Sequence, residues 1–180
     1  MAVAPNSARA SGLALALDDG TRKSHSVAEN TAFVAGFFRG MSSKDSFAKL
    51  TASLYFIYAA MEGAFVDEGA HPAVREMDYA SLRRKVALEE DLSYYYGENW
   101  RDAVAPSPAT KKYVARIEQL RSEGSYLLVA HQYTRYLGDL FGGQMMAGMA
   151  TKSLALEPGR GISFYSFQNI ANVKDFIENW

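Results

Sequence analysis

The sequence predicts an all-α protein, a single-domain irregular helical bundle. Apolar residues recur at three- and four-residue spacing along most of the chain, which is the period of a buried helix face. No stretch combines alternating apolar and polar residues with many β-branched side chains, as a strand would. With 180 residues, 48% of them hydrophobic and 22% charged, the chain is long enough for one domain around one core.

The apolar periodicity and the positions of Gly and Pro set the expected helix boundaries. The predicted helices span residues 18–40, 44–66, 79–96, 109–121, 125–156 and 171 onward. Asp18 or Asp19 can cap the first helix, and Gly40 can end it. Residues 67–72 and 101–108 are predicted loops. In the third helix the positions expected in the core are Leu82, Val86, Leu92 and Tyr95.

The N-terminal residues 1–17 differ in composition from the rest of the chain. They are rich in Ala and Ser and contain no acid, and Arg9 is their only basic residue. Either a flexible arm or the remnant of an organelle transit peptide has this composition. The longest apolar run, residues 52–61, is about half of the roughly 20 residues that a membrane-spanning helix needs, so we expect a soluble protein without a membrane span.

Composition excludes several classes of function. The net charge of −1 gives no reason to expect nucleic acid as a partner. The chain has no Cys, which excludes disulfides, thiolate metal sites and cysteine nucleophiles. Any iron chemistry must therefore use histidine or carboxylate ligands.

The helix predicted over residues 125–156 contains an unusual number of glycines, namely Gly138, Gly142, Gly143 and Gly148. Each costs about 1 kcal/mol relative to alanine inside a helix. Gly138 and Gly142 are four residues apart and face the same way, so they would let a flat molecule approach the backbone, or a neighbouring helix pack closely. Arg135 and Asp139 form a second four-residue pair beside this face, and a closely packed seam of small residues has no use for such a pair.

The chain has three histidines. His71 follows Glu68 in a single Glu-x-x-His pattern, whereas a di-iron carboxylate bundle needs that pattern twice. We expect His131 to be structural or exposed, because no carboxylate lies near it in the sequence. His25 is followed one helical turn later by Glu29, which could orient the imidazole as a metal ligand or form an ordinary helix pair. A single histidine ligand facing a glycine-lined surface is a coherent haem pocket.

Four segments resemble the haem oxygenase family, most closely its soluble cyanobacterial and plastid branch. They are GTRKSHSVAEN (residues 20–30), LYFIYAAME (54–62), LEEDLSYYYGENWR (88–101) and LLVAHQYTRYLGDLFGGQ (127–144). The resemblance extends from about residue 20 to the end of the chain. It implies a haem oxygenase-type domain over residues 18–180, without the last C-terminal helices of the family.

The resemblance also implies roles for individual residues. His25 would be the proximal iron ligand, and Glu29 would orient it. Gly138 and Gly142 would lie against the distal face of haem. Asp139 would anchor a water network that delivers protons, with Arg135 and Tyr58 in the same network, and Tyr133 and Arg22 would lie near the haem propionates.

The reaction implied by the resemblance is oxidative ring opening of haem to biliverdin, with release of carbon monoxide and ferrous iron. Haem is both substrate and cofactor, and dioxygen is the co-substrate. The expected electron donor is ferredoxin or a reductase, and the expected location is the plastid stroma or the cytoplasm. A degenerate haem-binding carrier or sensor without turnover is the alternative, and a haem-free helical interaction protein is a third interpretation.

Several positions depart from the family pattern, namely Phe141, Ala147, Gly148, Asp18 and Ile177. Phe141 replaces a serine, and it either crowds the distal side or packs away from it. Ala147 and Gly148 replace lysines that help to dock the electron donor. Asp18 and Ile177 replace basic residues directed at the propionates. Without the last helices, we expect residues 164–167 and the glycine-bearing helix to face water as an apolar patch.

Overall fold

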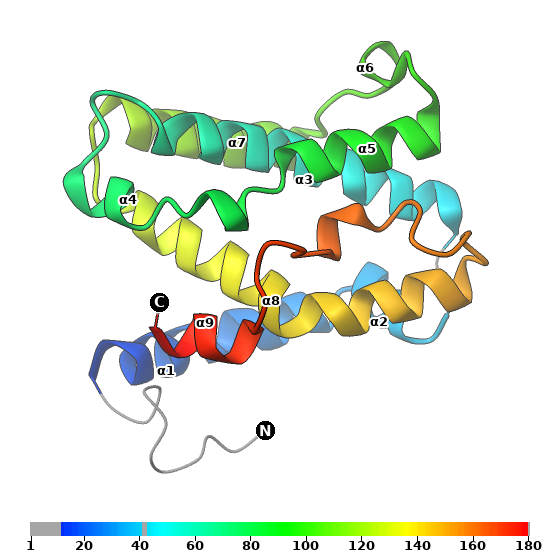
Figure 1. Cartoon of the computed structure of the whole chain (residues 1–180), viewed down its shortest axis with the longest axis horizontal. Coiled ribbons are helices and arrows are strands. Elements are labelled where there is room, and N and C mark those ends of the chain that lie inside the picture. The colour runs from blue at the N-terminus through cyan, green and yellow to red at the C-terminus, as the bar shows by residue number, and fades with distance from the viewer. Residues whose placement is uncertain (1–11, 41–42, 180) are drawn as a thin grey trace. The chain divides into compact units, whose positions relative to one another are not determined.

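The computed structural model describes residues 12–40 and 43–179, and these divide between two compact units (Figure 1). The small unit lies within Met1–Ser42 and Lys174–Trp180, and the large unit is Ser43–Val173. Helices and short 3-10 turns are the only regular secondary structure within these described ranges. The predicted all-α fold class is therefore confirmed.

The N-terminal part of the small unit contains two helices, α1 (Gly12–Glu29) and α2 (Ala32–Phe38). They are separate because Thr31 takes an extended backbone conformation and caps α2, its hydroxyl accepting a hydrogen bond from the Val34 amide at 3.4 Å. The prediction of one helix over residues 18–40 is wrong at this break, although the chain does turn at Gly40, where φ is +68°. The predicted caps Asp18 and Asp19 lie inside α1.

Residues 12–17, the last part of the predicted flexible arm or transit-peptide remnant over residues 1–17, form the first turns of α1. Residues 1–11 lie outside the described part of the chain.

The large unit contains most of the helices. They are α3 (Lys44–Phe65), α4 (Pro72–Glu76), η2 (Ala80–Leu82), α5 (Lys85–Tyr96), α6 (Trp100–Ala103), α7 (Pro108–Ser122), α8 (Leu128–Ser153) and η3 (Ser163–Tyr165). Helix α9 (Val173–Asn179) begins at the last residue of the large unit, and its other residues belong to the small unit. Helix α3 packs against both α5 and α7 and contacts α8, so it is the central helix of the unit (Figure 1). None of the helices in residues 12–40 and 43–179 combines the length and the apolar content needed to cross a bilayer.

The predicted third helix begins later than expected. Residues 80–82 form a 3-10 turn, and α5 begins at Lys85 and ends at Gly97, where φ is +82°. Helix α5 turns Leu88 and Leu92 into the core, and Val86 is about 200° away from Leu88 around the helix. Val86 is 68% exposed, so its predicted burial is wrong. The predicted loop over residues 101–108 also begins inside the short helix α6.

The segment between α8 and α9 is buried where the sequence predicted exposure. Phe164, Tyr165 and Phe167 all lie in the core, so the expected apolar patch over residues 164–167 does not exist. In Figure 1 this segment is the orange chain that runs between α5 and α8, and both of these helices contact η3. Its backbone is held by polar side chains, which the apolar pattern of the sequence does not reveal.

Candidate functional site

The glycine-bearing helix α8 presents two kinds of glycine. A Cβ atom added to Gly138 or Gly142 would meet no other atom within 4 Å, whereas a Cβ on Gly143 would lie 3.1 Å from Cδ1 of Tyr165. Close packing of small residues therefore explains Gly143 but not Gly138 and Gly142. These two glycines leave open space beside the helix backbone, as a site for a flat molecule requires.

Tyr58, Arg135 and Asp139 meet beside this glycine face, as the sequence predicted. Tyr58 comes from α3 and donates a hydrogen bond from its hydroxyl to Oδ2 of Asp139 on α8. Arg135 lies one turn before Asp139, and its guanidinium carbon is 5.5 Å from the centroid of the Tyr58 ring. Asp139 is only 8% exposed, so this carboxylate is a buried acid that accepts a hydrogen bond from Tyr58 and interacts with the charges of Arg135 and Arg84.

Burial sets the protonation behaviour of this group. Loss of solvent raises the pKa of Asp139 from 3.8 to about 6, although the charge of Arg135 and the hydrogen bond from Tyr58 both act to lower it. Burial also raises the pKa of Tyr58 well above its usual value, so its hydroxyl stays protonated and keeps donating. Interactions with Tyr58 and with the carboxylate of Asp139 raise the pKa of Arg135, which stays cationic. Asp139 can therefore both accept and release a proton near neutral pH.

A second polar group, which the sequence did not predict, supports this network. Oε1 of Glu62 accepts hydrogen bonds from the backbone amides of Arg84 at 2.5 Å and Lys85 at 3.0 Å, and from the Tyr136 hydroxyl at 3.4 Å. The Tyr136 ring packs edge-on against Tyr58 with centroids 5.5 Å apart. Glu62 follows Tyr58 by four residues and so shares its face of α3, which was the available signal.

Two buried polar side chains on α8 have atoms without a hydrogen-bond partner among the described residues. They are the amide of Gln132, which is 0% exposed, and Nε of Arg135. Buried polar groups of this kind usually bind ordered water or a ligand atom. Arg135 lies one helical turn before Asp139 and Gln132 lies two turns before it, on the same helix. The expected water network stays a prediction.

His25 and Glu29 form the expected pair on α1. Nδ1 of His25 lies 3.5 Å from Oε2 of Glu29, and both side chains are exposed. This geometry lets the carboxylate orient the imidazole and leave Nε2 for a metal. His25 belongs to the small unit and Asp139 to the large unit, so their meeting at one haem stays a prediction.

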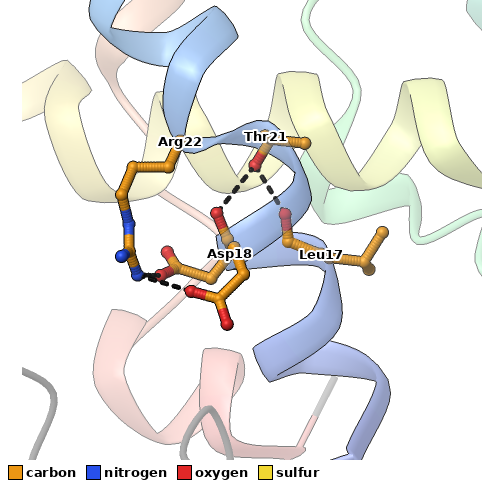
Figure 2. Close-up of polar contacts among 5 residues, drawn as sticks. Leu17, Asp18, Thr21 and Arg22 are labelled. Carbon is orange, nitrogen blue, oxygen red and sulfur yellow. Dashed lines mark hydrogen bonds and ion pairs between the residues drawn. The ribbon is translucent and has the colours of Figure 1, made fainter.

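Arg22, expected near the propionates, is already paired within α1. Its Nη2 atom lies 3.0 Å from Oδ2 of Asp18 and 2.7 Å from Oδ1 of Asp19 (Figure 2). All three side chains are exposed. A propionate would have to compete with Asp18 and Asp19 for this guanidinium.

The other two histidines have structural partners. Nδ1 of His131 is 2.9 Å from the Tyr113 hydroxyl, and burial lowers the pKa of His131. His71 caps α4, its Nδ1 atom accepting a hydrogen bond from the Ala73 amide at 3.2 Å. The contact of His131 agrees with the structural role expected for it, whereas the sequence assigned no role to His71.

Two further positions on α8 were singled out by the sequence. Phe141 is 53% exposed, so its ring is not packed into the core of the large unit. Tyr133 is half-buried, and its role near the propionates stays a prediction.

Comparisons with known proteins identify the family. The family model described as heme oxygenase matches residues 11–180. The chain is 45% identical over 166 residues to heme oxygenase 1 of Nostoc sp., covering 92% of this chain and 70% of that protein. It is 46% identical over 168 residues to the heme oxygenase of the alga Pyropia yezoensis, covering 93% and 71% of the two chains.

Among solved structures, the chain is similar to heme oxygenase-1 from a Synechocystis cyanobacterium in complex with heme. The TM-score is 0.87 at 45% sequence identity, and the match covers 92% of this chain and 75% of the other. This likeness extends over the large unit that carries Tyr58, Arg135 and Asp139. The chain belongs to the haem oxygenase family.

Proposed function

We propose that this chain opens the haem ring oxidatively to biliverdin, with release of carbon monoxide and ferrous iron, and that Asp139 controls the protons of this reaction. The observation that carries the assignment is the buried pair of Tyr58 and Asp139 beside the open face of Gly138 and Gly142. When bound, haem supplies the iron that takes up dioxygen and the ring carbon that is oxidised.

The proposed proton donor is water held by Asp139. A carboxylate with a pKa of about 6 is close to the optimum for general acid and base work at neutral pH. Tyr58 fixes one carboxylate oxygen, so the other oxygen can hold water. Arg135 supplies a fixed positive charge that keeps a useful fraction of Asp139 ionised although it is buried.

We assign His25 as the iron ligand and Glu29 as the residue that orients it. Neutral imidazole is a usual ligand of haem iron, and a carboxylate at the other ring nitrogen fixes the tautomer and makes the ligand more basic. The 3.5 Å separation between Nδ1 and Oε2 supports this arrangement.

The propionate and electron-donor assignments rest on the family resemblance. We assign Arg22 and Tyr133 to the propionates and ferredoxin to electron supply, with the plastid stroma or the cytoplasm as the location. Ala147 and Gly148 replace docking lysines, so we expect weaker docking of an acidic donor than in relatives that keep these charges.

A haem carrier without turnover is the competing function, and the pairing of Arg22 with two acids is the observation that favours it. The test is to add haemin and ascorbate in air, with catalase present to remove free hydrogen peroxide, and to record the absorption spectrum. We expect the haem band to fall while a biliverdin band grows. A haem band that persists in fully loaded protein would assign the chain to the carrier class.

A further inference from the structure

Residues 161–167, which we call the aromatic strap, run between α5 and α8 and contact Tyr58. Their start is fixed at Gly161, where φ is +73° and an added Cβ would lie 2.7 Å from both Cδ1 of Tyr94 and the hydroxyl of Tyr95. The Tyr95 hydroxyl donates a hydrogen bond to the Gly161 carbonyl at 2.7 Å. Only glycine fits here, so the start of the strap is held against α5 in one conformation.

Asp91 of α5 holds the next residues of the strap. Its Oδ1 atom accepts the Ser163 amide at 2.7 Å, and its Oδ2 atom accepts the Phe164 amide at 2.9 Å. Asp91 is 1% exposed, and both of its oxygens are used. Only a carboxylate has an acceptor at each of these two positions, because an asparagine would turn an amide group toward one of the backbone amides.

Two more side chains hold the carbonyl groups of the strap. Arg84 donates from Nη1 to the Ser166 carbonyl at 2.6 Å and to the Phe164 carbonyl at 3.4 Å. Gln144 of α8 donates from Nε2 to the Tyr165 carbonyl at 2.7 Å. The strap is therefore anchored to α5 and to α8 through its own backbone.

The strap in turn contacts Tyr58 and the helix that carries Asp139. The Phe164 ring packs edge-on against Tyr58, with centroids 5.2 Å apart and planes at 76°. Tyr165 packs against Gly143, one helical turn after Asp139. The Tyr58 ring thus lies between Phe164 and Tyr136, which leaves its hydroxyl directed at the carboxylate.

We infer that Asp91 is a positioning residue for haem oxidation: it holds the amides of Ser163 and Phe164, and so keeps the Phe164 ring against Tyr58 and the Tyr58 hydroxyl on Asp139. This inference rests on the proposed function for its catalytic consequence. Its structural part can be tested without haem. If Asp91 serves folding alone, replacing it changes the stability of the protein and leaves the pKa of Asp139 unchanged.

The test compares Asp91→Asn with the control Glu90→Gln, which changes the adjacent exposed acid on the same helix. In haem-free protein with carbon-13-labelled aspartate, the carboxyl titration of Asp139 is followed by NMR. The titratable and charged groups around this carboxyl are Tyr58, Arg135, Arg84, Tyr136 and Tyr165. Burial is the largest cause of the raised pKa of Asp139, so water admitted beside a loosened Phe164 ring should lower this pKa by about one unit, roughly tenfold in proton affinity. Loss of the Tyr58 hydrogen bond acts to raise the pKa, but it is the smaller effect. Glu90→Gln should leave it unchanged.

Turnover supplies the second measurement. In Asp91→Asn we expect kcat for biliverdin formation to fall about tenfold, part of what general acid catalysis contributes, while the haemin dissociation constant changes less than about twofold. Phe164→Leu keeps both Asp91 hydrogen bonds and removes the ring on Tyr58, so it should change the same quantities in the same directions.

The outcomes separate the two proposals. If the Asp139 titration and kcat of folded Asp91→Asn and Phe164→Leu match the parent while only the melting temperature falls, the positioning role is overturned. If Asp91→Asn does not fold, Phe164→Leu decides alone. If the parent makes no biliverdin, the proposed function fails, and the titration still decides whether Asp91 positions Asp139.

Discussion

Replacing Gly142 by alanine should make the haem-free protein more stable and the haem complex weaker. An added Cβ would meet no other atom within 4 Å, so the substitution introduces no clash into the folded protein. Alanine is favoured over glycine inside a helix by about 1 kcal/mol, so the free energy of unfolding should rise by about that amount. For a protein of this size the melting temperature should rise by about 2–4 °C.

Gly143→Ala is the matched control, one position along the same helix. There the new methyl group would lie 3.1 Å from Cδ1 of Tyr165, in a contact that must relax, so this variant should gain less stability or lose some. Haemin affinity should fall in Gly142→Ala and should change less in Gly143→Ala. Gly142→Ala places a methyl group where we assign the haem, whereas Gly143→Ala changes the side that faces the strap.

The assay is urea unfolding of both haem-free variants, followed by haemin titration monitored by absorbance. If Gly142→Ala is more stable and binds haemin as tightly as the parent, haem does not lie against Gly142. If Gly142→Ala is destabilised without haem, the open space beside this residue is filled by protein, and close packing was the correct interpretation of this glycine.

Three more predictions concern charged and ionisable side chains. His25→Ala should abolish the histidine-ligated haem spectrum and turnover, with partial recovery on adding imidazole, whereas His131→Ala should keep both; the reverse result would make His131 the ligand. The pKa of Asp139 is about 6 in the folded protein and near 4 in the unfolded chain, so the folded state binds more protons between these two pH values. The free energy of unfolding should therefore fall by about 3 kcal/mol as the pH rises from about 4 to above about 6. Urea unfolding of haem-free Asp139→Asn between pH 4 and 7 should lack that share of the decrease, and an unchanged pH dependence would contradict the raised pKa. Asp18→Ala should free Arg22 for a propionate and tighten haemin binding, but by at most about threefold, because exposed ion pairs are weak. Asp45→Ala breaks a similar exposed pair with Lys49 and should leave haemin binding unchanged.

The parts of the site that were predicted correctly depend on local spacing. The helix predicted over residues 44–66 is observed as Lys44–Phe65, because its apolar stripe and the capping Ser43 are both short-range signals. Arg135 and Asp139 share a face because they are four residues apart on one helix, which no tertiary contact is needed to establish. The resemblance then supplied the partner from another helix, Tyr58.

The errors arose where a weak local signal competed with the apolar period. The first helix ends at Glu29 and Thr31 caps the next, yet the four-residue spacing of His25, Glu29, Phe33 and Phe37 continues across this break. The apolar period also assigned Val86 to the core, although the 3-10 turn before α5 changes the direction in which the following residues point. Both features depend on backbone angles at one or two residues, which periodicity does not report.

The buried charges around the aromatic strap could not have been predicted from periodicity at all. Asp91 and Arg84 lie in or beside a helix with many charged residues, where the usual expectation for each is exposure to solvent. Their partners are backbone groups of residues 163–166, about 70 to 80 positions further along the chain, and backbone groups leave no trace in a side-chain pattern. Residues 164–167 were predicted to face water because no later helices were expected to cover them, whereas the structure buries Phe164, Tyr165 and Phe167, and α5 and α8 contact this segment. The polar anchors that hold it there do not show in the apolar pattern. A buried carboxylate with two backbone partners is destabilising if either partner is lost, so the strap cannot move far while Asp91 is ionised. That constraint, together with the apolar contacts, holds the Phe164 ring against the Tyr58 ring while the Tyr58 hydroxyl donates to Asp139.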